Sequence, residues 1–382
     1  MMARKTVKAA FYRGGTSKAV MFNAVDLPDD KELRDRIFLA VMGSPDAYGR
    51  QLDGMGGGIS SLSKIVIVEP SPRDDADIDY TFVQIAVGEP VADYGQMCGN
   101  MSSAVGPFAL EEGLVSASGN ATMVRVHNTN TGKVFHSTFA VQNGRAIEEG
   151  DFEIPGVSQC GAKVQLDFLD PGGSRTGQLL PTGHAVQDLE VPGLGTFTAS
   201  MVDASNPVVF VNASDLGVKG NENPVDLDAD KALMDKLDMI RRQGAVAMGL
   251  ANAPEIAQLS TPKVALVAAP STFTALDGRD YGPSDYHVSV RLVSMGNFHR
   301  AITLTGAMCV AVAARVPDSL IAEHVPPLGD VLIGNPSGVL PVQADVGDGP
   351  DGLIAHSATT FRTQRRIMEG YLPYPEALET LG

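Results

Sequence analysis

Apolar residues alternate with polar residues, or form short continuous runs, in six segments of the first half of the chain. Glycine, proline, aspartate or asparagine residues separate most of these segments. Alternation with a period of two is typical of half-buried β-strands, and the separating residues are typical of turns. The first half is therefore predicted to be rich in strands. The segments are 6–12, 63–70, 80–87, 121–127, 135–142 and 163–169.

Helical spacing of apolar residues predicts helices in the same chain. In the longest such segment, Leu233, Leu237 and Ile240 fall on one face, and aspartates precede them. Acidic residues suit the N-terminus of a helix because they face the positive end of its dipole. The predicted helices are 30–44, 98–115 and 228–250.

The second half repeats the order of the first. Strand-like segments at 261–270 and 285–294 lead into a turn of small and hydroxyl residues, and then into a helix over 305–316 that is rich in Ala, Val and Met. The comparable helix of the first half runs from Gly99 to Leu114. A turn-rich stretch, 169–183, is the expected join between two domains. The expected domains are 1–183 and 184–382, with the chain end able to pack back on the first.

Length and charge limit the class of protein. At 382 residues the chain is too long for one ordinary core, which agrees with two domains. No stretch approaches eighteen consecutive apolar residues, so no membrane partner is expected. The N-terminus lacks the apolar region of a secretory signal, which predicts a cytoplasmic protein. A net charge of −16 opposes nucleic-acid binding.

Cysteine, histidine and glycine patterns indicate no metal or cofactor. Cys98, Cys160 and Cys309 are widely spaced and form no CxxC pair, and the seven histidines form no HxxxH or HExxH cluster. Cys309 lies inside an apolar helix, where packing is its expected role. The glycine run 54–58 lacks the GxGxxG spacing of a dinucleotide site. The chemistry is therefore expected to need no cofactor.

Lys64 stands at the start of the apolar run 65–68, behind the glycine run 54–58. Strand alternation places its side chain on the same face as Val66 and Val68, which favour burial. Burial disfavours the charged amine and lowers its pKa from an ordinary value of roughly 10.4. Lys64 is therefore a candidate general base. The alternative is a strand-end lysine whose amine reaches water.

Cys98 opens the predicted helix 98–115. A thiol at a helix N-terminus faces the positive end of the dipole, which lowers the pKa of the thiol and favours the thiolate. The same amides can bind a carboxylate, so Gly99, Asn100 and Met101 are candidate substrate-binding residues. The alternative is a small buried cysteine at the start of a helix.

The N-terminal motif RGGTSK is a candidate anion clamp. It is rich in glycine but does not follow the GxxxxGK[ST] pattern of a nucleotide-binding loop. Arg13 can supply a forked pair of donors, and Thr16 and Ser17 can supply hydroxyl groups. Arg13 and Ser17 are therefore predicted to contact an anionic substrate.

A turn near the start of the second-half helix offers a further set of candidates. Met295, Gly296, His299, Thr305 and Gly306 provide amides, a hydroxyl group and an imidazole, but no thiol. His299 could position an acidic substrate, whereas a lone histidine is more often structural.

Six motifs, taken in order from Arg13 to beyond Ala314, resemble the 2-methylaconitate cis-trans isomerase family, PrpF. Their length and their order across most of the chain make the resemblance specific. The motifs are YRGGTSKA, DGMGGGISSLSK, MCGNMSSAVGPFALEEGLV, LLPTG, TPKVALVA and SMGNFHRAITLTGA.

The resemblance implies an α+β fold of the diaminopimelate epimerase type. Such a fold has two similar domains, each with a curved, mostly antiparallel sheet around a central helix, and the site in the cleft between them. It also implies that Lys64 and Cys98 are the family's catalytic lysine and cysteine. Family members act on unsaturated di- and tricarboxylates, and include isomerases of 2-methylaconitate, aconitate and methylitaconate and the related 4-oxalomesaconate tautomerases.

Two stretches depart from the pattern of the 2-methylaconitate isomerases. VADYGQMCGN, at 91–100, lacks the tryptophan of that group, and NPSGVL, at 335–340, replaces a histidine-containing form. Both leave the substrate open within the class.

Three functions were compared with these features. The sequence favours a cofactor-independent isomerase of unsaturated polycarboxylates, with a small-molecule substrate and a homodimer as the candidate assembly; a 4-oxalomesaconate tautomerase is the alternative within that class. A two-thiol racemase would need a second cysteine where Thr305 stands. A non-catalytic accessory protein that binds an organic acid and assists a hydratase is the alternative outside the enzymes.

Overall fold

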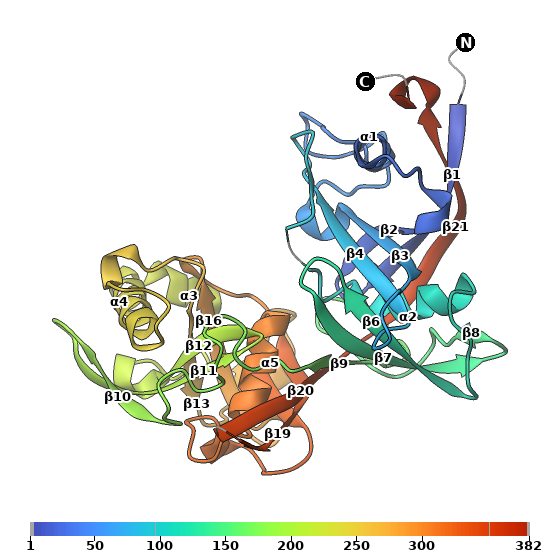
Figure 1. Ribbon diagram of the computed structural model, residues 1–382. Helices are drawn as coiled ribbons and strands as arrows, with labels where there is room; N and C mark the ends of the chain where they lie inside the picture. The colour runs from blue at the N-terminus through green and yellow to red at the C-terminus, as the bar shows by residue number, and fades with distance from the viewer. Residues whose placement is uncertain (1–3, 96, 351, 380–382) are drawn as a thin grey trace. The chain divides into compact units, whose positions relative to one another are not determined.

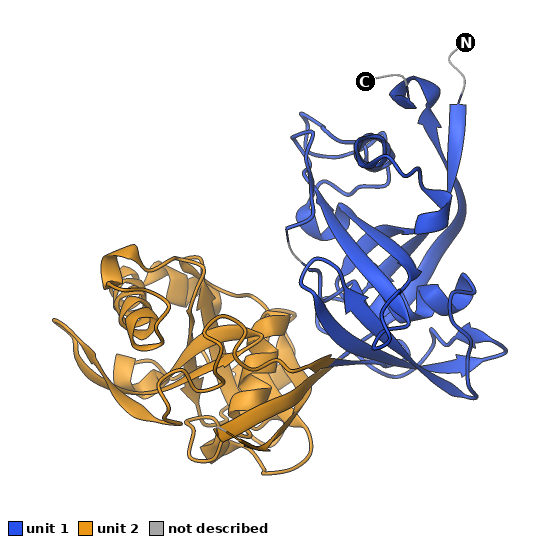
Figure 2. Cartoon of the chain, in the orientation of Figure 1, with its two compact units in different colours: residues 1–167, 361–382 blue, residues 168–360 orange. Residues whose placement is uncertain are grey.

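The computed structural model describes residues 4–95, 97–350 and 352–379, and the chain divides into two compact units. Unit 1 comprises residues 1–167 and 361–382, and unit 2 comprises residues 168–360 (Figure 2). Unit 1 is thus built from both ends of the chain.

The described residues of unit 1 contain two α-helices, α1 and α2, and more of them lie in strands than in helices (Figure 1). Its strands are β1 Arg4–Gly14, β2 Ser17–Asn23, β3 Lys64–Pro70, β4 Ile78–Ile85, β5 Ala92–Asp93, β6 Ala121–Asn128, β7 Lys133–Gln142, β8 Arg145–Ala146, β9 Val164–Leu169, which crosses the unit boundary, and β21 Gln364–Pro375. Its α-helices are α1 Lys31–Met42 and α2 Ser102–Glu111, and its 3-10 helices are Ala24–Asp26, Ser60–Leu62 and Glu376–Glu379.

Unit 2 contains three α-helices and the remaining strands. Its strands are β10 Gln187–Val191, β11 Gly195–Ala204, β12 Asn206–Asn212, β13 Lys263–Ala268, β14 Phe273–Thr274, β15 Asp280–Tyr281, β16 Val288–Ser294, β17 Asn297–Phe298, β18 Val331–Asn335, β19 Gly338–Gly349 and β20 Gly352–Arg362, which crosses the boundary. Its helices are α3 Pro224–Ala229, α4 Lys231–Ala247 and α5 Leu304–Ala313, and its 3-10 helices are Ala213–Leu216, Pro254–Ile256 and Ala322–His324.

The two units repeat one strand topology. In unit 1, β1 is antiparallel to β2, β2 is parallel to β3, β3 is antiparallel to β4, and β4 pairs with β5 and, in parallel, with β6. In unit 2, the strands β11, β12, β13, β16, β17 and β18 pair in the same order and the same directions. The repeat predicted from the order of elements is therefore present in the pairing of the strands.

Each parallel pair of strands needs a crossover, and helices supply it. Helix α1 connects β2 to β3 and α2 lies between β5 and β6, while α4 and α5 hold the same places in unit 2. Residues 102–110 of α2 and 306–313 of α5 are all buried. A helix that is buried on every side lies within its unit and not on its surface.

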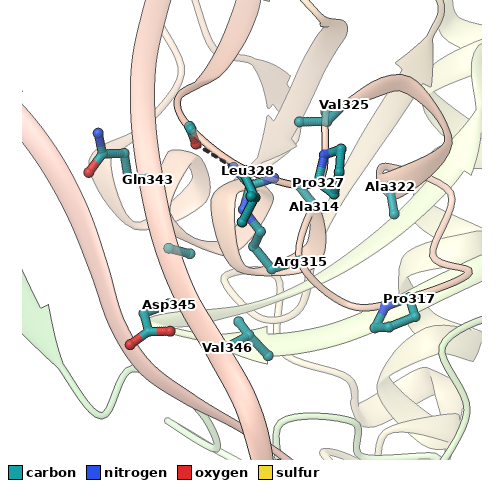
Figure 3. A pocket seen from close by; sticks show the side chains of 12 residues that line it. Ala314, Arg315, Pro317, Ala322, Val325, Pro327, Leu328, Gln343, Asp345 and Val346 are labelled. Carbon is teal, nitrogen blue, oxygen red and sulfur yellow. Dashed lines mark hydrogen bonds between the residues drawn. The ribbon is translucent and has the colours of Figure 1, made fainter.

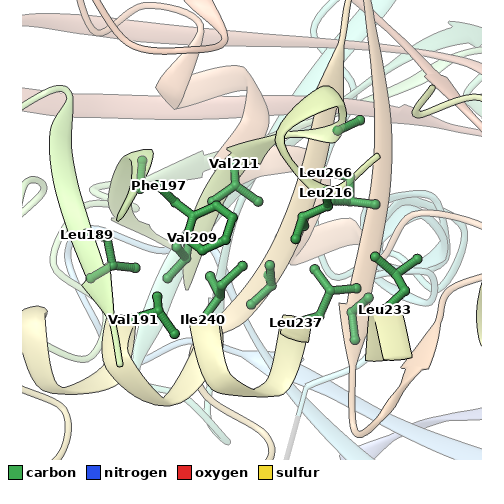
Figure 4. Close-up of a cluster of buried hydrophobic side chains, with 14 of the residues drawn as sticks. Leu189, Val191, Phe197, Val209, Val211, Leu216, Leu233, Leu237, Ile240 and Leu266 are labelled. Atoms are coloured by element: carbon green, nitrogen blue, oxygen red, sulfur yellow. The ribbon is translucent and has the colours of Figure 1, made fainter. Parts of the chain in front are cut away.

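The core of unit 2 shows why the amphipathic segment forms a helix against the sheet. Leu233, Leu237 and Ile240 of α4 pack against Val209 and Leu266 of the strands (Figure 4). Every segment that was predicted as a strand overlaps an observed strand, and every predicted helix overlaps one or two observed helices, although the predicted helices extend a few residues beyond most of the observed ends.

One predicted helix is divided in two. The segment 228–250 contains the end of α3 and the whole of α4, separated by Asp230. The Asp230 carboxylate accepts a hydrogen bond from the amide of Leu233 at 3.0 Å. The aspartate that suggested a helix start therefore caps α4, and its extended backbone ends α3.

The turn-rich stretch 169–183, which was expected to join the domains, lies inside unit 2. Asp203 of β11 is fully buried, and its carboxylate accepts hydrogen bonds from Ser174 Oγ at 2.5 Å and from the amide of Thr176 at 2.7 Å. Its own amide donates to the carbonyl oxygen of Leu179 at 3.0 Å. These bonds hold the stretch on the sheet of unit 2, so the change of unit comes at 167/168.

The end of the chain completes unit 1. Strand β21 pairs antiparallel with β1, from Arg4 opposite Pro375 to Gly14 opposite Gln364, with an irregularity between Phe11 and Tyr12.

Among the described residues, no helix combines the length and the apolar character needed to cross a lipid bilayer.

Candidate active site

Lys64 is the first residue of β3, and its side chain is 8% exposed. Its neighbour across the antiparallel pair is Gln84 of β4, whose Oε1 accepts a hydrogen bond from Lys64 Nζ at 2.6 Å. The Nε2 of Gln84 donates to the carbonyl oxygen of Ser63 at 2.8 Å, which orients the amide. The amine also lies over the ring of Phe82, 4.9 Å from its centroid. The side chain is therefore buried and held, and does not extend into solvent.

The surroundings of Lys64 favour its neutral form. Burial lowers the pKa of Lys64 below 10.5, and the nearby Cys98 offsets part of this effect. No carboxylate in the described part of the chain forms an ion pair with it. A buried amine without an anionic partner gives up its proton more readily than an exposed lysine, and this is the property that a general base requires.

Cys98 does not begin the helix, as the sequence had suggested. Helix α2 begins at Ser102, and Cys98 lies in the turn before it. The carbonyl oxygen of Cys98 accepts hydrogen bonds from the amide of Ser102 at 3.2 Å and from the hydroxyl group of Tyr80 at 3.1 Å. These bonds fix the turn by its backbone and leave the thiol half-buried. The thiol thus precedes the first helical turn and takes no part in it.

The turn that contains Cys98 is packed against the β1–β2 hairpin. Asn100 Nδ2 donates to Thr16 Oγ1 at 3.1 Å. A Cβ atom at Gly15, whose φ is +52°, would lie 2.4 Å from Asn100 Oδ1, and one at Gly14 would lie 2.8 Å from the carbonyl oxygen of Asn100. Both glycines are therefore needed for this close approach. Amides 99–101 donate to no acceptor within the described residues, so they remain candidate ligands for an anion.

Arg13 and Ser17 lie on the same hairpin but in different surroundings. Ser17 is buried beside the turn, opposite Gly14. Arg13 Nη1 donates to the carbonyl oxygen of Gly15 at 3.0 Å and to Thr363 Oγ1 at 2.9 Å. Burial and then Arg365 lower the pKa of the Arg13 guanidinium. These bonds give Arg13 a structural role, and contact with a substrate stays a prediction.

Sequence reasoning missed the segment that supports this turn. Thr363 accepts hydrogen bonds from Arg13 and also, through its carbonyl oxygen, from the amide of Gly15 at 2.9 Å. Arg362 Nε donates to Asn100 Oδ1 at 3.4 Å. Both residues come from the end of the chain, about 260 to 350 positions away in the sequence. No local pattern could have placed them here.

The candidates from the second half fall into two groups. Met295 and Gly296 are the two residues of the β16–β17 hairpin turn, and both have positive φ, at 55° and 80°. Met295 is 58% exposed. A two-residue hairpin with both residues at positive φ explains their presence without a substrate.

The other candidates surround the start of α5. Thr303 caps this helix by accepting a hydrogen bond from the amide of Gly306 at 3.1 Å. A Cβ atom at Gly306 would lie 2.8 Å from Thr303 Oγ1, so glycine keeps the cap in place. Thr305 is half-buried, and the buried Nε2 of His299 has no hydrogen-bond partner within the described residues.

Lys263 joins this second group, and the sequence analysis missed it. It is the first residue of β13 and is 8% exposed. Its Nζ donates to Thr303 Oγ1 at 3.1 Å and to Thr305 Oγ1 at 3.3 Å. The available signal was the run TPKVALVA, which places a lysine at the mouth of an apolar strand, as SLSKIVIV does for Lys64.

The third cysteine does not take the place of a second catalytic thiol. Cys309 is fully buried in α5, and its Sγ donates to the carbonyl oxygen of Val202 at 3.4 Å. Burial raises the pKa of the Cys309 thiol to about 12. A thiol in this state is inert, and its role is packing.

One cavity of unit 2, of about 600 Å³, lies beyond the C-terminal end of α5 (Figure 3). The guanidinium group of Arg315 lies at its edge and donates to the carbonyl oxygens of Pro326, at 2.7 Å, and Gly329. Its lining includes neither a lysine nor a cysteine.

The described residues also contain no cluster of three His, Cys, Asp or Glu side chains suited to a metal ion.

Comparisons with known proteins fit this architecture. The family model described as PrpF protein matches residues 4–375. The chain is 38% identical to the 2-methyl-aconitate isomerase of Shewanella oneidensis, with 97% of each chain covered, and 38% identical to the 3-methylitaconate isomerase of Eubacterium barkeri, with 97% and 98% covered. It is also 38% identical to the 4-oxalomesaconate tautomerase of Pseudomonas putida, with 97% and 96% covered.

Solved structures confirm the fold that the sequence predicted. A crystal structure of methylitaconate-delta-isomerase superposes with a TM-score of 0.91 at 36% identity and covers 98% of this chain and 97% of its own. A hydroxyproline epimerase from Agrobacterium vitis has a TM-score of 0.51 at 12% identity, with 99% and 95% covered, which indicates a shared fold alone. The fold is of the diaminopimelate epimerase type, and the full-length family match and the relatives show that this chain belongs to the PrpF family.

Proposed function

We propose that this protein is a cofactor-independent isomerase of unsaturated di- and tricarboxylates that removes a proton from carbon and returns it. The observation that carries the proposal is the buried Lys64, which has no carboxylate partner in the described chain and a lowered pKa. The names of the relatives indicate the class of substrate.

Lys64 is the proposed base. Its neutral amine takes a proton from a carbon atom adjacent to a double bond that is conjugated with a carboxyl group. The C–H bond breaks, an N–H bond forms, and the electron pair spreads over the allylic system and the carboxyl group. The acceptor Gln84 Oε1 holds one N–H of the amine, which directs the lone pair of nitrogen elsewhere. The face of Phe82 stabilises the ammonium ion once it has formed.

The intermediate needs donors for its developing negative charge. The amides of residues 99–101, which donate to no acceptor in the described part of the chain, and the half-buried thiol of Cys98 are the proposed donors in unit 1. While the charge is delocalised, the former double bond can rotate or change position. Return of the proton to the original carbon gives cis-trans isomerisation, and return to the far end of the allyl system gives a shifted double bond. In both cases one proton leaves carbon and one returns to carbon, so substrate and product have the same composition and charge.

The proposal covers the class and not one acid. Three relatives with different named substrates are equally similar to this chain, at 38% identity. A 4-oxalomesaconate tautomerase would use the same base and the same intermediate. The accessory role without catalysis predicts binding of the acid without turnover. The cytoplasmic location and the homodimer stay predictions.

The test is proton NMR of the purified protein in deuterium oxide with a panel of acids: cis- and trans-aconitate, 2-methylaconitate, methylitaconate and 4-oxalomesaconate. We expect turnover of at least one acid, with solvent deuterium entering at the carbon that regains the proton. The position of the label separates cis-trans isomerisation from a double-bond shift. Folded protein that turns over no acid would contradict the proposal.

A further inference from the structure

Three basic residues lie side by side across three neighbouring strands of unit 1. In the antiparallel register, Arg13 of β1 is directly opposite Lys18 of β2 on one side and Arg365 of β21 on the other. Residues that are directly opposite in an antiparallel pair project from the same face of the sheet, where like charges repel each other. This basic row, Lys18, Arg13 and Arg365, is therefore unfavourable unless an anion lies against it.

The charges of the basic row are not neutralised within the protein. None of the ion pairs among the described residues includes a member of the row. Arg365 Nη1 donates to the neutral Gln159 Oε1 at 3.3 Å, and Lys18 Nζ lies 5.4 Å from the centroid of the Phe11 ring. Burial and then the charge of Arg365 lower the pKa of the Arg13 guanidinium, so the two cations are close enough to repel.

A cavity of about 830 Å³ lies against the basic row. All three members of the row line it, together with the loop segment 157–160. Every residue of its lining belongs to unit 1. Its volume is in the range of pockets that hold small organic molecules, roughly 300–1,000 Å³.

The acidic residues of the lining leave it with excess positive charge. Glu148 and Glu149 line the cavity, and Glu148 Oε1 accepts a hydrogen bond from the backbone amide of Arg366 at 2.5 Å. The side chain of Arg366, the fourth basic residue of the lining, forms ion pairs with Glu111 and Glu112. The three cations of the basic row thus outnumber the two carboxylates, in a chain whose net charge is −16.

The cavity is separate from the candidate active site. Successive residues of a strand project from opposite faces, so Arg13 and Gly14 face different ways. A Cβ atom at Gly14 would lie 2.8 Å from the carbonyl oxygen of Asn100, so the face of Gly14 is the one that meets the turn of Cys98. The basic row projects from the other face, and the lining of its cavity includes neither Lys64 nor Cys98.

We propose that the basic row and its cavity form a binding site for a small organic molecule that carries several phosphate or carboxylate groups. Arg13 makes its hydrogen bonds to Gly15 and Thr363 through Nη1 alone, so Nε and Nη2 have no partner among the residues described. A guanidinium group binds such oxyanions with pairs of N–H donors, and the ammonium group of Lys18 adds a third cation. The site goes beyond the proposed function, because no step of the isomerisation uses it.

The experiment uses the exposed thiol of Cys160 as a reporter, because this residue lines the cavity. Alkylation by iodoacetamide is followed by peptide mass spectrometry as pyrophosphate or tricarballylate is added at constant ionic strength. Tricarballylate is a saturated tricarboxylate that cannot isomerise. We expect at least one of the two anions to slow alkylation of Cys160 saturably, and the effective anion identifies the group that is bound. Cys98 in the same samples reports separately on the candidate active site.

Variants of the basic row test whether its charges hold the anion. Arg365→Met should raise the anion concentration for half-maximal protection of Cys160 about tenfold, because a charge-assisted contact is lost. Lys18→Met should change it in the same direction. Arg145 is an exposed arginine of unit 1 outside the cavity lining, and Arg145→Met is the matched control that should behave as wild type does.

Each result decides the proposal. Alkylation of Cys160 that neither anion slows would overturn it, as would protection that is equal in wild type, Arg365→Met and Lys18→Met. An equal loss of protection in Arg145→Met and Arg365→Met would reduce the effect to the overall charge of the protein and also overturn it. Protection of Cys98 alone would reject this site and leave the proposed function standing. Protein that turns over no acid but whose Cys160 is protected through Arg365 would refute the proposed function and support the site.

Discussion

Lys64 and Lys263 are equally buried and begin equivalent strands, yet the groups that surround their amines differ. Lys64 lies between one amide oxygen and an aromatic face, whereas Lys263 lies between two hydroxyl groups beside a histidine. Burial lowers the pKa of both amines. The comparison shows that two lysines with the same burial and the same place in the strand order differ in their polar neighbours, so the repeat of the strands does not extend to the contacts of the amines.

The helix starts beside the two lysines differ in the same way. Thr303 caps α5 with its side chain, whereas no side chain caps α2. The uncapped start leaves a turn in unit 1 with free amides and a half-buried thiol. At the capped start of α5 the Thr303 hydroxyl group accepts from the amide of Gly306, and Cys309 is buried inside the helix.

The strongest test of this difference is Lys64→Met. Loss of the proposed base should lower kcat by about 100- to 10,000-fold, the usual contribution of general base catalysis, while tricarballylate binding and the far-ultraviolet circular dichroism spectrum stay as in wild type. The exposed Lys133 is the matched control, and Lys133→Met should keep full activity. A Lys64→Met enzyme with substantial kcat would mean that the base lies elsewhere.

A smaller effect is expected for Cys98→Ser, with kcat lowered about tenfold. The pH profile carries the sharper information. A base works when it is neutral, so kcat/KM should rise with pH through the pKa of Lys64, with a midpoint below 10.5 because burial lowers that pKa. Cys98 raises the pKa of Lys64, so the midpoint should shift to lower pH in Cys98→Ser. An unchanged midpoint would show that the thiol and the amine do not interact.

The smallest effect is expected for the side-chain cap at the N-terminus of α5, which has no counterpart at the start of α2. Thr303→Ala removes the acceptor for the amide of Gly306 and should lower the free energy of unfolding by about 1 kcal/mol. Urea denaturation measures the change. Thr272, an exposed loop residue whose hydroxyl group has no hydrogen-bond partner within the described residues, provides the comparison, and Thr272→Ala should unfold as wild type does. Equal losses in the two variants would show that the cap bond of α5 contributes no stability.

Much of the fold could be predicted from local pattern. Short apolar runs predicted β3 and β13, which are buried on both faces over most of their length. Helical spacing of apolar residues predicted α4, which buries one face. The pairing of β1 with β21 joins residues at least 350 positions apart, and no local pattern records such a contact. The break at Asp230 shows the same limit at short range, since one aspartate both ends α3 and caps α4.

The sequence analysis singled out some residues of the candidate site and missed others, for a related reason. Lys64 was singled out as a candidate because it begins an apolar strand directly behind a glycine run, and the family resemblance implied its catalytic role. Lys263 has the same strand pattern, but its partners Thr303 and Thr305 are 40 and 42 positions away and carry no distinctive chemistry by themselves. Only the three-dimensional structure brings these hydroxyl groups to the amine. The sequence analysis began this helix at Cys98, whereas α2 begins at Ser102. Glycine and asparagine residues before a helix are compatible either with its first turn or with the preceding loop.

The pairing of β1 with β21 also sets an order of events during protein synthesis. The ribosome must make all of unit 2 before the strand that pairs with the free edge of β1 exists. Unit 2 can therefore fold while the chain is still growing, whereas unit 1 waits with an open strand edge. Open edges promote aggregation, so the interval before β21 emerges is the most vulnerable stage in the production of this protein.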